Sequence, residues 1–300
     1  MTRRFFVFPL LISLLLSSVG CSDDKSSNVV GQSSFSGDTL YSCSQDEFYS
    51  SSSLSDTLIS SSSENKSSSS VAIISCKTET EDDCEYGTFV DGRDGQTYKT
   101  VRIGNQIWMA ENLNYAYLQP TSTLDSSSWC YDNDPENCKK YGRLYLWSAA
   151  IDSAALFSIN GKGFGYGDDC GTLARPKKCS PDIPLRGVCP SGWHLTSTEE
   201  WLDLLFAVDG DLANLLKSRN EWPNGLGGED AFGFGVLPSG MASSRGNTVS
   251  YWQLGEYTDF WTSGGESTTA WTSGVLSEDD FSWKWDALPV RCIRDNPNLE

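Results

Sequence analysis

Ten cysteines set the first limit on how this chain can fold. Several lie a few residues apart with turn-forming sequence between them, as in the stretch CYDNDPENC at 130–138. A bond from Cys189 to Cys292 would enclose about a hundred residues and contribute about 4–5 kcal/mol by chain entropy. A bond from Cys189 to Cys170 or Cys179 would imply a different topology. The spacing predicts four disulfides, Cys76–Cys84, Cys130–Cys138, Cys170–Cys179 and Cys189–Cys292, and leaves Cys21 and Cys43 over.

Disulfides are typical of exported proteins, and the N-terminus predicts export. Arg3 and Arg4 precede an apolar run that is too short to span a bilayer, so residues 1–20 are expected to be a signal peptide. The ending Ser-Val-Gly-Cys resembles a bacterial lipobox, which implies lipidation of Cys21. The alternative is ordinary cleavage, with Cys21 as a plain thiol. We expect a protein that is anchored by lipid in the cell envelope, at the surface of the outer membrane.

Residues 21–85 have the composition of a linker. They contain three serine blocks, at 50–53, 60–63 and 67–70, and end in the acidic stretch KTETEDDCE. Such a segment cannot bury enough apolar surface to offset its chain entropy, so we expect a disordered tether.

The formal charge of −18 comes from 40 acidic and 22 basic residues. Long-range repulsion makes nucleic acid and anionic membrane surfaces unfavourable partners. Contact with the membrane is therefore expected only through the lipid anchor.

From residue 86 onward, short β-branched and aromatic runs alternate with turn dipeptides such as Asp94-Gly95 and Gly104-Asn105. They predict strands near 87–90, 97–103 and 106–109. The apolar spacing in 141–156 predicts a short helix. The best helix signal is Ser197 with Glu200, at capping-box spacing before an apolar stripe, and a further helix is predicted at 212–217.

The C-terminal third is rich in turns and aromatic residues, and the repeated WTSG at 261 and 271 predicts neighbouring strands. One α+β domain at 86–296, with a twisted antiparallel sheet and two or three short helices, accounts for these signals.

Six ordered blocks resemble the Fibrobacter succinogenes major paralogous domain: DGQTYKTVRIGNQIWMAENLNY, YGRLYLWSAA, CPSGWHLTSTEEW, DAFGFGVLPSG, FWTSG and LPVRCIRD. The resemblance implies an exported protein with a fold similar to the C-type lectins, a fold that formylglycine-generating enzymes share. It also implies that the N-terminal and C-terminal strands lie side by side, which would place the segment VRCIRD, with Cys292, next to early strands.

The only histidine, His194, stands just before the predicted capped helix. Because Trp193 and Leu195 alternate as in a strand, His194 should point away from them. General-base catalysis would need an orienting carboxylate and a nucleophile nearby, and the sequence contains no nucleophile elbow, phosphate loop or metal-spaced His/Cys group. This favours a structural role for His194 and predicts no catalytic residue, metal or cofactor.

Tryptophans provide the main candidate for a binding site, because flat aromatic faces can stack on sugar rings. Trp283 and Trp285 alternate beside Phe281, as on one strand face. The alternative is that these side chains fill the core. The predicted ligand-binding residues are Trp261, Trp271, Trp283 and Trp285.

Acidic residues provide weaker candidates. Glu221, Asn224, Glu229 and Asp230 could supply oxygen ligands to calcium, but a solvated acidic loop is the simpler interpretation. Glu111 could act as a catalytic acid, or it could hold backbone amides.

Three function classes follow. The preferred hypothesis is a tethered extracellular module, not an enzyme, that binds polysaccharide or a cell-surface partner. The second is an enzyme, either similar to formylglycine-generating enzymes or a carboxylate hydrolase. The cysteines that can be assigned to disulfides argue against the former, which needs a reactive cysteine pair. The third is a purely structural envelope protein.

Overall fold

The computed structural model describes residues 73–165, 171–172, 175–176, 181–208, 210–245, 247–266, 269–273 and 281–296. The signal peptide, Cys21, Cys43, the serine blocks, and both Cys170 and Cys179 lie outside the described residues. All the contacts below belong to one unit, Asn65–Glu300.

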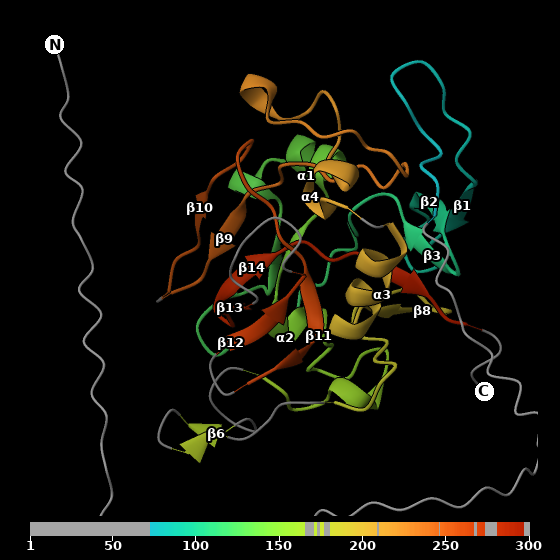
Figure 1. Ribbon diagram of the computed structural model, residues 1–300. Helices are drawn as coiled ribbons and strands as arrows, with labels where there is room; N and C mark the ends of the chain where they lie inside the picture. The colour runs from blue at the N-terminus through green and yellow to red at the C-terminus, as the bar shows by residue number, and fades with distance from the viewer. Residues whose placement is uncertain are drawn as a thin grey trace, which may run out of the picture. The chain divides into compact units, whose positions relative to one another are not determined.

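An antiparallel sheet joins the two ends of the domain (Figure 1). Its strand order is β1-β2-β3-β15-β8, so the C-terminal strand lies between the N-terminal hairpins and β8. Gly104, at φ 59°, sits in the two-residue turn between β2 and β3, as the Gly-Asn signal predicts. The predicted strands near 87–90, 97–103 and 106–109 are confirmed. The bounds are β1 (Tyr86–Val90), β2 (Thr97–Ile103), β3 (Gln106–Met109), β8 (Trp193–Leu195) and β15 (Cys292–Arg294).

A second sheet has the order β10-β9-β14-β5-β4, and a three-stranded sheet has the order β11-β12-β13. The pairing of β11 with β12 confirms that the two WTSG repeats form neighbouring strands. The bounds are β4 (Ser128–Trp129), β5 (Leu144–Leu146), β9 (Met241–Ser243), β10 (Ser250–Trp252), β11 (Trp261–Gly265), β12 (Thr269–Thr272), β13 (Phe281–Trp283) and β14 (Asp286–Leu288), with a separate pair β6 (Gly171–Thr172) and β7 (Arg175–Pro176).

The helices are short. The predicted capping box is confirmed at α3, where the Ser197 amide donates to Glu200 Oε2 at 2.8 Å and the Glu200 amide donates to Ser197 Oγ at 3.2 Å. The predicted helix at 212–217 is also confirmed as α4. The bounds are α1 (Pro135–Tyr141), α2 (Trp147–Ala150), α3 (Thr198–Val208) and α4 (Leu212–Leu216), with 3-10 turns η1 (Tyr131–Asn133), η2 (Ile159–Gly161) and η3 (Pro223–Gly225).

The helix predicted over 141–156 is wrong for most of its length. Tyr141 ends α1, residues 144–146 form β5, and α2 covers only Trp147–Ala150. All three residues of β5 are buried between β14 and β4, and such burial on both faces overrides helical spacing. The loop 130–138 contains a helix that the sequence analysis missed, although Asp134 at its N-cap and Pro135 at its first turn are start signals.

Three of the four predicted disulfides fall on described residues, and all three are present. Their Cα–Cα distances are 4.8 Å for Cys76–Cys84, 4.8 Å for Cys130–Cys138 and 6.0 Å for Cys189–Cys292. The long-range bond joins the loop before β8 to the last strand, and both of its cysteines are buried. The α+β class with few short helices and disulfide cross-links is therefore confirmed.

The described contacts begin before residue 86, where the sequence analysis places the start of the domain. The Ile73 amide donates to the Ala207 carbonyl, and the Cys76 and Lys77 amides donate to the Ala231 carbonyl. Lys77 also pairs with Asp230 at 2.5 Å. These bonds fix the acidic stretch around Cys76–Cys84 to α3 and to the loop near residue 231.

Candidate functional site

One face of the β10-β9-β14 sheet forms the floor of an open groove. The strand register places Ser243 opposite both Ser250 and Asp286, so these three side chains form a polar row across the sheet. Met241 and Trp252 form the next row along the strands. The groove has a volume of about 620 Å³ and is lined by Met241, Ser243, Arg245, Ser250, Trp252, Gln253, Trp285 and Asp286.

The opposite face of the same sheet belongs to the core. Ala242 and Ala287 alternate with the groove residues and pack with Leu146 against Tyr131. The sheet therefore has one apolar face that the fold covers and a second face that carries the groove, on which Ser250 and Trp252 are exposed while Ser243 and Asp286 are buried.

Two tryptophans border the groove. Trp252 ends β10 and is 46% exposed. Trp285 lies in the turn between β13 and β14 and stacks on Trp283, with ring centroids 4.6 Å apart and an interplanar angle of 7°. The Arg245 guanidinium lies 5.7 Å from the Trp285 ring centroid, and the Ser244 amide donates to the Trp285 carbonyl at 2.8 Å. Trp285 is thus held in place by its neighbours, whereas Trp252 presents an open indole surface.

Asp286 is the acid of the groove floor. Burial raises the pKa of its carboxyl, and hydrogen bonds from Ser243, Ser282 and the Trp283 backbone offset only part of this effect. The Ser282 hydroxyl donates to Oδ2 at 3.1 Å. An ionised Asp286 can accept hydrogen bonds, whereas Ser250 and Gln253 can both donate and accept.

A second group of aromatic side chains extends from Trp285 onto β12 and β13. Trp271 pairs with Phe281 across the two strands, and Trp283 follows Phe281 on the same face. Trp271, Phe281 and Trp283 are 41%, 54% and 43% exposed. Ala270, on the other face of β12, is buried. We refer to Trp271, Phe281 and Trp283 as the aromatic platform.

The four predicted ligand-binding tryptophans differ in their exposure to solvent. Trp271 and Trp283 are exposed, and Trp285 is half-buried beside the groove. The prediction is wrong for Trp261, which is fully buried and donates from Nε1 to the Tyr145 carbonyl at 2.7 Å. The reason is that β11 lies against α2 and α3, so Trp261 is part of the core although it opens the same repeat as Trp271.

Sequence reasoning missed the rest of the groove. Trp252, Arg245, Gln253 and Asp286 were not predicted as site residues, because their proximity arises from the pairing of β9 with both β10 and β14. One signal was present in the sequence of β10. Ser250 and Trp252 alternate with Tyr251, which is the spacing of a strand with one accessible face.

His194 lies between two carboxylates. Its Nε2 is 2.7 Å from Glu200 Oε1, and its Nδ1 is 2.6 Å from Asp295 Oδ1. Burial lowers the pKa of the imidazole, but the hydrogen bonds and charges of Glu200 and Asp295 outweigh burial and raise it above its ordinary value. The imidazolium therefore ties the first turn of α3 to the chain after β15. With both ring nitrogens engaged in this way, the geometry is that of a structural bridge.

The stability of the domain should depend on this bridge below neutral pH. Folding raises the pKa of His194, so the bridge stabilises the folded state only while the imidazole is protonated. This stabilisation is fully present below the pKa of the unfolded chain, about 6.5, and is lost as the pH rises through the pKa of the folded state. We expect the free energy of unfolding, measured with denaturant, to fall as the pH is raised from 6 to 9. His194→Gln should cost about 1–2 kcal/mol at pH 6, remove this slope and leave ligand binding within a few-fold.

His194 is the only histidine in the chain, so no other histidine can change the free energy of unfolding between pH 6 and pH 8. A slope of equal size in His194→Gln would contradict the bridge.

The acidic residues of 221–230 have separate partners. In the described part of the chain, no group of three or more His, Cys, Asp or Glu side chains is arranged to hold a metal ion. Asn224 lies exposed in η3. The acids have the following partners: Glu221 pairs with Lys140 at 2.7 Å, Glu229 accepts from Asn214 at 2.8 Å, and Asp230 pairs with Lys77 at 2.5 Å.

Glu111 binds a backbone amide, which is one of the two roles predicted for it. Its Oε2 accepts a hydrogen bond from the Lys99 backbone amide at 2.6 Å. It borders a small polar cleft of about 140 Å³ next to α1.

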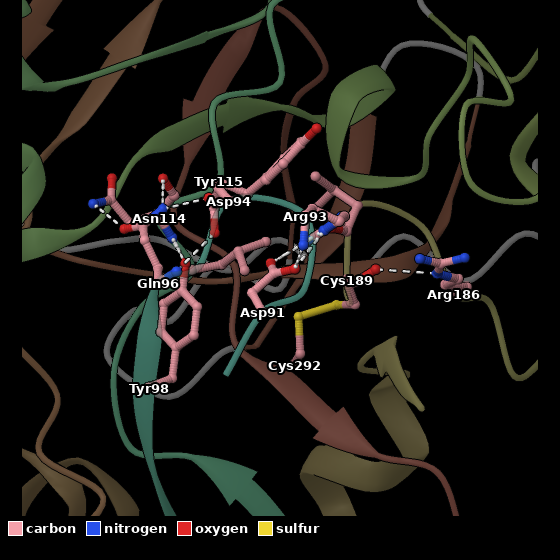
Figure 2. A network of polar contacts seen from close by, with 12 residues as sticks. Asp91, Arg93, Asp94, Gln96, Tyr98, Asn114, Tyr115, Arg186, Cys189 and Cys292 are labelled. Carbon is pink, nitrogen blue, oxygen red and sulfur yellow. Dashed lines mark hydrogen bonds and ion pairs between the residues drawn. A yellow bond between two sulfur atoms is a disulfide. The ribbon is translucent and has the colours of Figure 1, made fainter. Parts of the chain in front are cut away.

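A polar network surrounds the Cys189–Cys292 bond (Figure 2). Arg93 pairs with Asp91 at 2.7 Å and donates to the Val188 carbonyl at 2.8 Å. Its guanidinium also lies 4.0 Å from the Tyr115 ring centroid. These contacts fix the loop that carries Cys189 onto the end of β1, so the network serves the fold.

The strand order, the disulfides and the groove together define a cross-linked α+β domain with an accessible aromatic surface. The family model described as the Fibrobacter succinogenes major domain matches residues 101–294, more than half of the 300-residue chain. The protein belongs to this family, which confirms the resemblance found in its sequence blocks. No curated protein matches the chain, and no solved structure matches it. Among the described residues, no helix is long and apolar enough to cross a membrane.

Proposed function

We propose that this protein is a membrane-tethered extracellular binding module that binds polysaccharide through the groove. The observation that carries the proposal is the combination of exposed Trp252 with the polar row of the same sheet face, in which Ser250 is exposed and Ser243 and Asp286 are buried. A sugar ring has an apolar face and a rim of hydroxyl groups. An indole can cover the former, while short polar side chains bind the latter. The volume of about 620 Å³ lies in the usual range for ligand sites.

The fold supports an extracellular location and the lectin-like type. We infer a C-type-lectin-like domain, in which the C-terminal strand lies next to early strands. The pairing of β15 with the early strand β3 and the bond between Cys189 and Cys292 fit this arrangement, although β2 and β3 separate β15 from β1. Disulfides favour an oxidising compartment. The signal peptide at 1–20, the lipid on Cys21 and the serine-rich linker after it would hold the domain at the outer surface of the cell envelope.

Substitution of Trp252 tests the groove. We expect Trp252→Ala to weaken polysaccharide binding at least about tenfold, because it removes one well-packed aromatic contact with the ligand. The unfolding temperature should remain nearly unchanged, because the side chain is half-exposed. The full chain would first be screened on arrays of neutral and acidic glycans, and the strongest binder titrated by calorimetry. Phe206→Ala, at a 69% exposed aromatic side chain on α3, is the matched control. Equal losses in the two variants, or none in either, would contradict the proposal.

Substitution of Cys21 tests the anchor. We expect Cys21→Ala to move the protein from the membrane fraction to the soluble fraction of the cell, because the variant cannot carry the lipid. Fractionation followed by immunoblotting measures this, with mass spectrometry of the wild-type N-terminal peptide as the control. Retention of the variant in the membrane fraction would contradict lipid anchoring.

A further inference from the structure

The aromatic platform is continuous with the groove. Trp283 belongs to the platform and stacks on Trp285, and Trp285 lines the groove. Trp271 and Phe281 continue the platform as a cross-strand pair. Four aromatic side chains from β12, β13 and the following turn therefore lead into the groove that Trp252 borders.

The two parts of this surface differ in chemistry. The groove holds the groups that can form hydrogen bonds: Ser243, Ser250, Gln253, Arg245 and Asp286. The platform presents three aromatic side chains and no charge of its own. Stacking depends on the ring faces of a sugar and tolerates different hydroxyl configurations, whereas hydrogen bonds in the groove discriminate between them.

We infer that the groove and the platform form one track for a linear, uncharged polysaccharide, which the protein contacts at several consecutive sugar units. This inference rests on the proposed function and adds the class of ligand. A single short sugar would fill the groove and leave the platform unused. An acidic polysaccharide would be repelled by a chain with a formal charge of −18, and among the described residues that line the groove Arg245 is the only cation.

The length of the oligosaccharide distinguishes binding in the groove from binding on the aromatic platform. Ligands that only fill the groove should bind equally well to the wild type and to a platform variant. Longer chains should bind more tightly to the wild type, because each further unit can stack on the platform. We expect about a tenfold gain in affinity from trimer to hexamer.

The experiment uses the full chain and soluble oligosaccharide ladders of two to eight units: β-1,4-glucan, β-1,4-mannan, β-1,4-xylan, α-1,4-glucan and a uronic acid series. The double variant Trp271→Ala/Phe281→Ala should bind hexamer only about as tightly as trimer, with trimer affinity unchanged. Phe281→Ala alone, at the most exposed platform residue, should lose part of the gain and serves if the double variant fails to fold. Phe206→Ala should retain the full gain.

The outcomes distinguish the inference from the function on which it rests. Groove binding that does not change with chain length, or platform variants that weaken trimer and hexamer equally, would overturn the track and leave the proposed function standing. Preference for the uronic acid series would overturn the uncharged class. Absence of binding to every ladder would contradict both the track and the proposed function.

Discussion

Replacement of both Cys189 and Cys292 by alanine is expected to lower the free energy of unfolding by about 4–5 kcal/mol. The bond closes a sequence separation of 103 residues, and the entropy that it removes from the unfolded chain grows with the logarithm of that length. The loss is a large share of the stability of an ordinary domain. Denaturant unfolding at neutral pH, followed by tryptophan fluorescence, measures it.

The two local disulfides provide matched controls. Each closes a separation of 8 residues, for which the same relation gives about 2.5 kcal/mol. Alanine pairs at Cys76/Cys84 and Cys130/Cys138 should therefore lose about half as much as the Cys189/Cys292 pair. A smaller loss at Cys189/Cys292 than at either local pair would show that the long-range bond is not a principal constraint on this fold.

Arg291→Lys is expected to destabilise the domain by about 3 kcal/mol. The guanidinium is fully buried, and its Nε donates to Asn112 Oδ1 at 2.6 Å. Nη1 donates to the carbonyls of Met109 and Phe234 at 3.0 and 2.9 Å, and Nη2 donates to the Gly235 carbonyl at 3.2 Å. Lysine lacks this planar set of donors, so it would leave several buried acceptors unpaired, each at a cost of about 1 kcal/mol or more.

Arg291 also carries a buried charge, and burial lowers the pKa of its guanidinium. Carbonyl dipoles and the ring of Phe234, whose centroid is 4.7 Å away, stabilise the charge. Arg102→Lys is the control, because Arg102 is partly exposed and forms an ion pair with Glu85 at 2.9 Å, a contact expected to contribute less than about 1 kcal/mol. Similar stability of the two lysine variants in denaturant unfolding would contradict the structural role assigned to Arg291.

Local signals in the sequence were sufficient for part of the fold. The hairpin at 97–109 has alternating side chains and a Gly-Asn turn, and α3 has a complete capping box, so each forms from neighbouring residues. The segment 144–146 could not be assigned in this way, because its strand character depends on β14 and β4, which are distant in the sequence. The contacts of Arg291 are equally non-local.

The candidate site likewise has one part that the local sequence indicated and another that depends on contacts between distant residues. The density of tryptophans near the C-terminus indicated the platform, because Trp271 and Trp283 lie close in sequence to Phe281. Trp261 was misassigned, since only the packing of β11 against α2 and α3 shows that it is buried. The groove requires three strands in register, and nothing in the local sequence of Asp286 places it opposite Ser243.

The most direct test of polysaccharide binding by the groove is hydroxyl-radical footprinting of the aromatic side chains, with and without the polysaccharide selected by the glycan screen. Peptide mass spectrometry gives the oxidation rate of each aromatic side chain, phenylalanine included, in the full chain. We predict that bound polysaccharide slows oxidation of Trp252 several-fold and leaves the rate at Phe206, on α3, unchanged. Unchanged oxidation of Trp252 under saturating polysaccharide would contradict the proposed groove.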